Sequence, residues 1–263
     1  MRTGLPGGVR RRNRGLTKAA PFWYFGSHSM DRAGTLHSSG TDLQHFLSSL
    51  SLFHAVDENL LVSFTKALKS LNMEKGNRLF SQGDTADSFY LLRQGFMKIL
   101  RESESGRSTL FELLGPGELV GVVAVVNGRP FPASAETAVS CEVLSMPGSR
   151  FLGFLNEHAR LAENYAQVMS RRLLKTREMQ GQTMASVESR IARLMVELGE
   201  RIGRKDGTSV RMPRMFTRQE IADMAGTTVE STIRTFSKWK QVQMIKEEDK
   251  TVIFSVENFK DLI

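Results

Sequence analysis

The side chains that could do chemistry gather in one stretch, TRQEIADMAGTTVESTIRTFSKW, at residues 217–239. Within it Glu230 and Arg234 stand four residues apart, a spacing that places both on one face of a helix. An arginine can donate two parallel hydrogen bonds to O6 and N7 of guanine, and a glutamate can accept one from N4 of cytosine. The two residues could also form an i,i+4 salt bridge worth about 0.2–0.5 kcal/mol. Both interpretations can hold, since such a bridge can orient the arginine.

Two helix-start signals lie in the same stretch. Thr217 with Glu220 matches a capping box, in which the threonine oxygen and the glutamate each satisfy a free backbone amide. Thr227 with Glu230 repeats the pattern. Gly226 can take the left-handed conformation that ends the first helix. Two capped helices joined by a tight turn predict a helix-turn-helix, with an ordinary helical corner as the alternative.

The residues that follow favour the first interpretation. Met244–Lys246 and Thr251–Phe254 are β-like runs on either side of a polar turn, which predicts a β-hairpin. A hairpin directly after a helix-turn-helix is a wing. Nucleic-acid binding is therefore favoured over a helical corner.

Other chemistries leave no pattern. The sequence has no nucleotide-hydrolysis loop, no metal-ligand spacing and no nucleophile beside a base, so we expect no catalytic residue, no metal and no enzyme. The single cysteine, Cys141, excludes an internal disulfide framework and a four-cysteine cluster. The longest apolar run, at residues 119–126, is far too short to span a bilayer. We therefore expect a cytoplasmic protein that does not enter the membrane.

The net charge of +8 is unevenly spread. Residues 1–40 hold seven basic side chains and one acidic side chain, hence +6, residues 41–186 hold 15 of each, and residues 187–263 hold 14 and 12, hence +2. The overall basicity therefore says little about nucleic-acid binding. Residues 1–40 lack periodicity and predict a disordered basic leader. One alternative is that Met30 is the true start and that residues 1–29 are not part of the natural protein, and a less favoured one is that this segment is a DNA-binding arm.

Periodicity indicates the elements that must position these residues. Residues 41–68 repeat apolar side chains every three to four positions and predict helices. Residues 77–102, 107–123 and 134–147 are strand-like runs with Gly-rich turns between them, which predict a small antiparallel β-roll. After Pro147 the pattern becomes helical.

The long helical run at residues 160–186 has a heptad-like seam, in which small, apolar and polar residues recur at alternating spacings of four and three. The seam could pack on its own domain, but self-association is the favoured interpretation. Its residues are Ala162, Ala166, Met169, Leu173, Thr176, Gln180 and Thr183. A second helical pattern at residues 187–203 precedes a predicted basic loop at Arg204 and Lys205.

Four motifs then resemble one family. Residues 80–99, FSQGDTADSFYLLRQGFMKI, resemble the glycine-rich strand-turn-strand of cyclic-nucleotide-binding domains. GPGELVG at residues 115–121 resembles the start of their phosphate-binding cassette, AQVMSRRLLKT at 166–176 their dimer helix, and the C-terminal stretch their winged DNA-reading domain. With these motifs in order over residues 41–263, the chain is identified as a member of the Crp/Fnr family of transcription regulators.

The resemblance implies an α+β fold: an N-terminal antiparallel β-roll of the cyclic-nucleotide-binding type, a long dimerisation helix and a C-terminal winged helix-turn-helix. The implied parts are a leader at 1–40, a sensor domain at 41–157, a dimerisation helix at 158–186 and a DNA-binding domain at 187–263. It also implies a homodimer that binds double-stranded DNA, with RNA polymerase as a further candidate partner. An effector in the β-roll would shift the packing of the dimer helices and re-aim the two recognition helices.

Two registers of the second helix compete. Simple periodicity buries Val229, Ile233 and Phe236. The family pattern buries Thr232, Phe236 and Trp239, and we favour it because Glu230 and Arg234 then match the base-reading residues of the family. The exposed Ile233 could contact a thymine methyl group, and the start of the first helix would hold backbone phosphate. The predicted DNA contacts are Thr217, Arg218, Gln219, Thr228, Val229, Glu230, Ile233, Arg234 and Ser237.

The implied effector pocket departs from the pattern of cyclic-AMP receptors, in which an arginine pairs with the cyclic phosphate and the cassette glutamate takes the ribose hydroxyl. Glu118 is retained, but Phe131 stands at the arginine position and Pro132 at the serine position, with Arg129 out of register. In the dimer helix Thr176 matches a nucleotide-touching threonine, while Arg177 replaces a serine. We therefore expect an effector other than cyclic AMP. The pocket residues are Gly117, Glu118, Leu119, Arg129, Phe131, Ser134, Thr176 and Arg177.

The sequence also bears on two cofactors and on one alternative function. Oxygen-sensing relatives hold an iron–sulfur cluster on several cysteines, which this chain lacks, and His45, His54 and His158 show no haem-binding pattern, so we expect neither group. Cys141 is expected to be a small buried hydrophobe. The alternative function is a ligand-binding regulatory module that acts through a protein partner and has a degenerate helix-turn-helix. Ile233 and Gln243, which replaces a family glycine, support that alternative.

Overall fold

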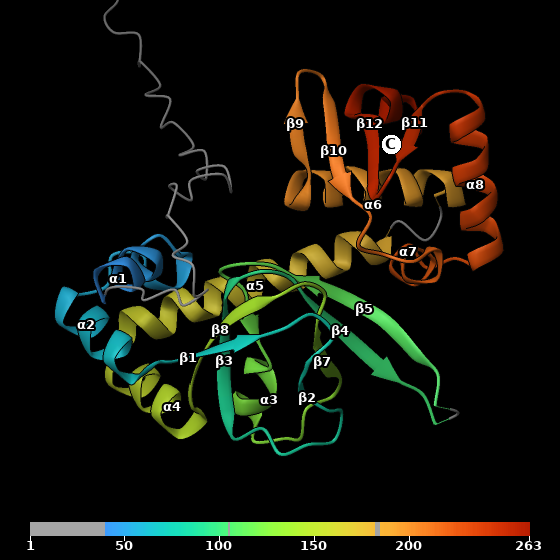
Figure 1. Ribbon diagram of the computed structural model, residues 1–263. Coiled ribbons are helices and arrows are strands. Elements are labelled where there is room, and N and C mark those ends of the chain that lie inside the picture. Colours follow the sequence, from blue (N-terminus) through green and yellow to red (C-terminus); the bar gives the residue numbers. More distant parts are fainter. Residues whose placement is uncertain (1–39, 105, 182–184) are drawn as a thin grey trace, which may run out of the picture. The chain divides into compact units, whose positions relative to one another are not determined.

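The computed structural model describes residues 40–104, 106–181 and 185–263, and its side-chain description excludes residues 40, 41 and 175–181 (Figure 1). The predicted leader at 1–40 lies, except for Gly40, outside the described residues. Helices α1 (Gly40–Ser48), η1 (Ser51–Phe53) and α2 (Glu58–Ala67) follow the apolar spacing of residues 41–68. Asp57 caps α2 by accepting hydrogen bonds from two backbone amides.

Two antiparallel four-stranded sheets form the predicted β-roll (Figure 1). The first has the order β1-β8-β3-β6, with β1 Lys69–Met73, β8 Cys141–Pro147, β3 Ser88–Gln94 and β6 Leu119–Val120. The second has the order β2-β7-β4-β5, with β2 Arg78–Phe80, β7 Ser134–Thr137, β4 Met97–Glu102 and β5 Ser108–Leu114. Cys141 is buried, as expected, and burial raises the pKa of its thiol.

One part of the strand prediction was wrong. Residues Val122–Asn127 form the helix α3, whereas strand character was expected up to residue 123. Gly121 and Gly128 lie at the two ends of α3 in the left-handed conformation, with φ of 72° and 59°. A short apolar run is compatible with either a buried strand or a buried helix, so periodicity alone could not distinguish the two for this segment.

Helix α4 (Gly148–Glu157) leads into the long helix α5 (Ala159–Gly181). One face of α5 packs on its own domain through the buried residues Leu161 and Asn164. The Asn164 amide donates hydrogen bonds to the carbonyls of Leu52 (3.0 Å) and His54 (2.8 Å). These two bonds fix α5 to the segment around η1.

The C-terminal part comprises three α-helices, one 3-10 helix and a four-stranded antiparallel sheet of order β11-β12-β10-β9. The elements are α6 (Val187–Ile202), β9 (Arg204–Asp206), β10 (Ser209–Pro213), α7 (Arg218–Met224), α8 (Val229–Gln241), β11 (Ile245–Glu248), β12 (Thr251–Ser255) and η3 (Val256–Leu262). The predicted wing corresponds to β11 and β12.

The prediction of a basic loop was wrong, because Arg204 and Lys205 lie in strand β9. Lys205 pairs with Val210 across the β9–β10 hairpin, and Val210 is buried. Since β9 is exposed along its length, it has no apolar alternation that the sequence could reveal. Within the described residues, no helix combines the length and the apolar character that a membrane span needs.

Candidate nucleic-acid interface and effector pocket

The helix-turn-helix begins with the predicted capping box. The Thr217 hydroxyl accepts a hydrogen bond from the Glu220 amide (3.1 Å), and the Glu220 carboxylate accepts one from the Thr217 amide (2.8 Å). Gly226 has the predicted left-handed conformation, with φ of 61°. The first helix and the turn of the motif are therefore confirmed.

The second cap lies one residue later than predicted. Thr228 is the N-cap of α8, and its hydroxyl accepts from the Ser231 amide at 3.2 Å. The Thr227 amide instead donates to the Ala222 carbonyl and completes the end of α7. The predicted pair of Thr227 with Glu230 was wrong because the turn needs one more residue before α8 can start.

The burial of α8 follows the register of the family pattern. Thr232, Phe236 and Trp239 are at most 1 % exposed, whereas Ile233 is 50 % exposed. Glu230, Arg234 and Ser237 are exposed as well, and Val229 is half-buried. The register from simple periodicity, which buried Ile233, was wrong. One face of α8 thus carries an arginine, a glutamate and an exposed apolar side chain.

The three predicted phosphate contacts at the start of α7 differ in their surroundings. Thr217 is exposed. The Gln219 amide donates to the Asp223 carboxylate at 2.8 Å. The Arg218 guanidinium lies 3.7 Å from the centroid of the Phe236 ring and pairs with Glu247 of β11. The structure therefore places Arg218 within the domain's own packing.

The C-terminal half of α8 contacts a carboxylate of α6. Glu188 of α6 accepts hydrogen bonds from Lys238 Nζ and Trp239 Nε1, both at 2.8 Å. The hydrogen bond from Lys238 lowers the pKa of the Glu188 carboxyl, with a smaller contribution from Trp239, and together they outweigh partial burial. Such a contact between α6 and α8 has no local signal in the sequence.

Gln243 stands where the family resemblance predicts a glycine. Its φ is 59°, in the left-handed region. The Met244 amide donates to the Trp239 carbonyl (2.9 Å) and the Gln243 amide to the Lys240 carbonyl (3.2 Å). These two bonds are those of a Schellman motif, which usually has glycine at this position. The replacement therefore keeps the backbone geometry that ends the recognition helix.

Glu118 and Ser134, two of the predicted effector contacts, both form hydrogen bonds with other residues of the chain. Glu118 accepts hydrogen bonds from the Gly115 amide and from Arg201 of α6. The fully buried Ser134 donates to the Glu102 carboxylate at 3.1 Å. Two of the polar groups predicted to meet an effector, Glu118 and Ser134, are thus partnered within the chain.

The other predicted pocket residues are dispersed. Phe131 is buried and Arg129 is exposed. Leu119 is buried in a separate apolar cluster from Phe131, and Gly117 has a left-handed φ of 84° in the turn before β6. Thr176 and Arg177 lie in α5 beyond the described side chains.

Two family models match the chain. The model described as the cyclic nucleotide-binding domain matches residues 70–158, and the model described as the Crp-like helix-turn-helix domain matches residues 189–262. Among curated proteins, the CRP-like cAMP-activated global transcriptional regulator of Mycobacterium tuberculosis is 24% identical over 214 residues, which are 81% of this chain and 96% of that protein.

The chain belongs to the Crp/Fnr family. The transcriptional activator protein Anr of Pseudomonas protegens is 29% identical over 181 residues, covering 68% of this chain and 74% of that protein. These relatives are transcriptional regulators and not enzymes, which confirms the expectation that this chain is not an enzyme.

Solved structures show the same fold. The c-di-GMP responsive regulator CLP of Xanthomonas campestris has a TM-score of 0.64 and 22% identity, covering 76% of this chain and 99% of that chain. FixK2 of Bradyrhizobium japonicum has a TM-score of 0.64 and 15% identity, covering 74% of this chain and 96% of that chain. At these identities the likeness concerns the fold alone.

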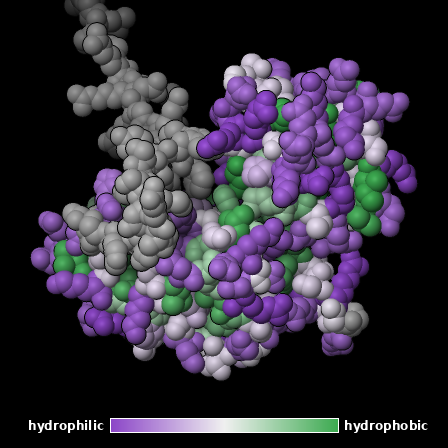
Figure 2. Space-filling view, viewed as in Figure 1, coloured by the Kyte–Doolittle hydropathy of each residue, from purple (hydrophilic) through white to green (hydrophobic). Residues whose placement is uncertain are grey.

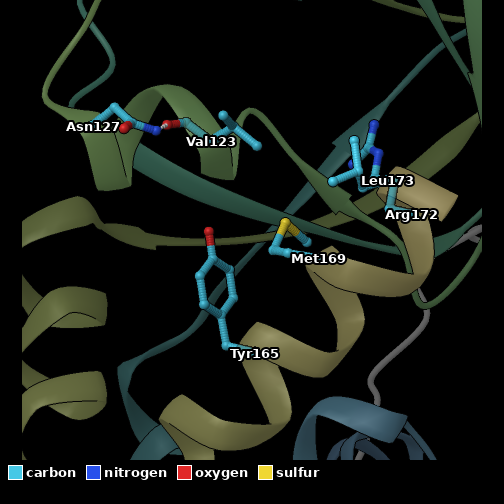
Figure 3. Close-up of a pocket in the computed structure, with 6 residues that line it drawn as sticks. All are labelled: Val123, Asn127, Tyr165, Met169, Arg172 and Leu173. Carbon is cyan, nitrogen blue, oxygen red and sulfur yellow. Dashed lines mark hydrogen bonds between the residues drawn. The ribbon is translucent and has the colours of Figure 1, made fainter. Parts of the chain in front are cut away.

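The seam of this Crp/Fnr-family chain is partly accessible. Ala166 and Leu173 are exposed, the latter at 54 %, and Ala162 and Met169 are half-buried. Gln180 and Thr183 lie, like Thr176, beyond the described side chains. The seam borders an open pocket of about 410 Å³ between α3 and α5 (Figure 3). The residues around it are Val123, Asn127, Tyr165, Met169, Arg172 and Leu173.

Proposed function

We propose that this chain is a homodimeric, effector-gated transcription regulator that reads an inverted-repeat DNA site with the helix at residues 228–239. The observation that carries the proposal is the two-sided character of α8. Its buried face fixes it to the domain, and its other face exposes Glu230, Ile233 and Arg234. A helix of this kind fits the major groove, where arginine and glutamate can distinguish base pairs.

The surface of the C-terminal domain agrees with a polar partner. In Figure 2 hydrophilic side chains cover most of the face of this domain that is in view. Residues 187–263 carry a net charge of +2. Because the charge is small, we infer that base contacts and positioned phosphate contacts contribute more than a strong overall field does.

The α5 seam supports self-association. Leu173 and Leu174 are 54 % and 59 % exposed on a helix whose other face is already buried. A second copy of α5 would cover Leu173 and Met169 and would close the open pocket beside them (Figure 3). We accordingly propose a sensor domain at 41–157, a dimerisation helix at 158–186 and a DNA-binding domain at 187–263.

The effector is proposed to be something other than cyclic AMP. Phe131, which the family pattern puts at the position of the phosphate-binding arginine, is buried, and the nearby Arg129 is exposed. A hydrophobic or weakly charged molecule, or no small molecule at all, fits such surroundings better than a buried anion does.

Selection of binding sites from a random duplex library tests the function. We expect an inverted repeat whose half-site centres are about 34 Å apart, one turn of the DNA helix. Gel shifts with the selected site should show one complex that contains two chains. A chain that selects no sequence, yet retains protein partners on an affinity column, would favour the alternative of a regulatory module acting through protein contacts.

A further inference from the structure

The recognition helix is held from two sides by carboxylates. Glu188, at the start of α6, accepts hydrogen bonds from Trp239 Nε1 and Lys238 Nζ. Glu247, on wing strand β11, pairs with Lys240 Nζ at 3.2 Å. Both carboxylates contact the C-terminal half of α8. Glu230, Ile233 and Arg234 lie in its N-terminal half, so the carboxylate contacts and these three side chains occupy different parts of one helix.

Glu247 also reaches the first helix of the motif. It pairs with Arg218, whose guanidinium is stacked on the Phe236 ring of α8. The side chains of Arg218 and Glu247 are 22% and 16% exposed, so the pair is largely shielded from water. An ion pair in such surroundings, with an aromatic ring on the guanidinium face, restrains its partners more strongly than a surface pair. Glu247 thereby joins α7, α8 and the wing.

These two carboxylates are unexpected next to a nucleic-acid reader. A negative charge close to the DNA-facing surface lowers the attraction to phosphate. Each of them also neutralises a lysine of α8, Lys238 or Lys240, that could otherwise contact phosphate. The two carboxylates therefore lower the affinity for DNA of any sequence. Their presence is explained if they fix the orientation of α8.

We propose that Glu188 and Glu247 are positioning residues that set the angle at which α8 presents Glu230, Ile233 and Arg234 to the base edges. The inference rests on the proposed DNA-reading function. It adds that sequence discrimination depends on two groups that never contact a base. It also makes Arg218 a member of this framework and not a free phosphate ligand.

The test uses the full chain with Glu188→Gln or Glu247→Gln. Affinity is measured for the duplex selected by the unaltered chain and for an unrelated duplex of the same length. Glutamine keeps the size of the side chain and removes the charge that holds the partner cations. We expect the ratio of specific to non-specific affinity to fall about tenfold, the effect of losing one charged hydrogen bond.

Matched controls separate position from charge. Glu200→Gln on α6 and Glu248→Gln on β11 each remove one negative charge from an exposed position of the same element. The ratio should stay unchanged in both controls. Partial unfolding lowers the active fraction for both duplexes alike, so a merely structural defect does not change the ratio. Trp239→Phe keeps an aromatic ring without the donor and should reproduce part of the effect of Glu188→Gln.

Two results would overturn the inference. In the first, Glu247→Gln binds both duplexes more tightly by the same factor and its salt dependence steepens by about one counterion, which would make Glu247 a simple neutraliser of Arg218 and Lys240. In the second, both variants discriminate as well as the unaltered chain. If the unaltered chain itself selects no site, the proposed function fails, and this inference fails with it.

Discussion

The ring of Phe131 lies flat against the ring of Phe80, with centroids 3.7 Å apart and planes at 10° to each other. A Cβ atom on Gly121, at the start of α3, would come within 2.5 Å of the Phe131 ring. The phenyl ring therefore fills the space beside the cassette that starts at Gly115. In the register that the family pattern predicts, this apolar ring occupies the position where cyclic-AMP receptors have their phosphate-binding arginine.

We expect no binding of cyclic AMP or cyclic GMP at micromolar concentrations. A buried cyclic phosphate without a cationic partner would lose several kcal/mol of hydration, about 2–7 kcal/mol even for an uncharged polar group. Isothermal titration calorimetry on the purified chain is the direct check. Micromolar binding that disappears in Arg129→Ala would show that the alignment of Phe131 is off and that the nucleotide site is intact.

Leu173→Glu should separate the dimer. The substitution places a carboxylate on the seam of α5, where two copies would bury it without a partner. We expect a monomer in sedimentation velocity and the loss of specific DNA binding. Gln167→Glu, an exposed position of the same helix outside the seam, is the control and should remain a dimer. A Leu173→Glu chain that still sediments as a dimer would exclude this seam.

Arg234→Ala should relax sequence preference at one G·C pair in each half-site, with a loss of about 1–3 kcal/mol for the preferred base. Arg234→Lys is the informative companion, because it keeps the charge and removes the planar pair of donors. It should lose the preference and retain the salt dependence. Equal losses for every base variant in Arg234→Ala would assign this side chain to phosphate.

Gln243→Gly should stabilise the protein. For a residue with a Cβ atom, the left-handed conformation costs roughly 1–2 kcal/mol, and glycine removes this cost. Glycine also has the larger conformational entropy in the unfolded chain, which offsets part of the gain. We expect the free energy of unfolding to rise by about 0.5–1 kcal/mol, measured by urea denaturation. Gln241→Gly, a helical position two residues earlier, should destabilise and serves as the control.

Acid should weaken the attachment of α8. The pKa of Glu188 is lowered by its hydrogen bonds, so its contribution to stability is present above the ordinary carboxyl value of 4.5 and is lost as pH falls through the lowered pKa. Burial by itself raises the pKa of Glu247, but the hydrogen bonds and charges of Arg218 and Lys240 together outweigh burial, so the pKa of this carboxyl is lowered too. The Glu188→Gln chain should therefore lose less stability than the unaltered chain between neutral and acidic pH. An unchanged pH dependence of urea denaturation would contradict this.

The parts of the fold that depend on local patterns could be predicted. The capping box at Thr217 and the left-handed Gly226 follow from residue types at fixed spacing, and both are confirmed. The burial of Trp239 required the family pattern, since the apolar Ile233 faces outward and Val229 is only half-buried, so that a count by periodicity is misled. An exposed apolar residue on a reading surface is where periodicity is expected to fail.

Contacts between distant elements could not be predicted. Glu188 and Glu247 lie 51 and 29 residues from Trp239 and Arg218 respectively, and nothing near them in the sequence identifies their partners. The same holds for Glu118, which the family resemblance predicts to meet the effector and whose carboxylate is paired with Arg201. The partners of these carboxylates depend on how distant elements such as α6 pack, and that packing is determined by residues throughout the core.

Arg190 on α6 gives the motif one more property. Its guanidinium donates to the carbonyl of Ala185 (2.7 Å), before α6, and to those of Ala225 (3.0 Å) and Gly226 (3.1 Å), in the turn between α7 and α8. The turn cannot open locally without breaking two of these bonds. Its amides should then exchange with solvent deuterium only when α6 also loosens, so that this stretch of the chain unfolds as one cooperative unit and not as a fraying loop.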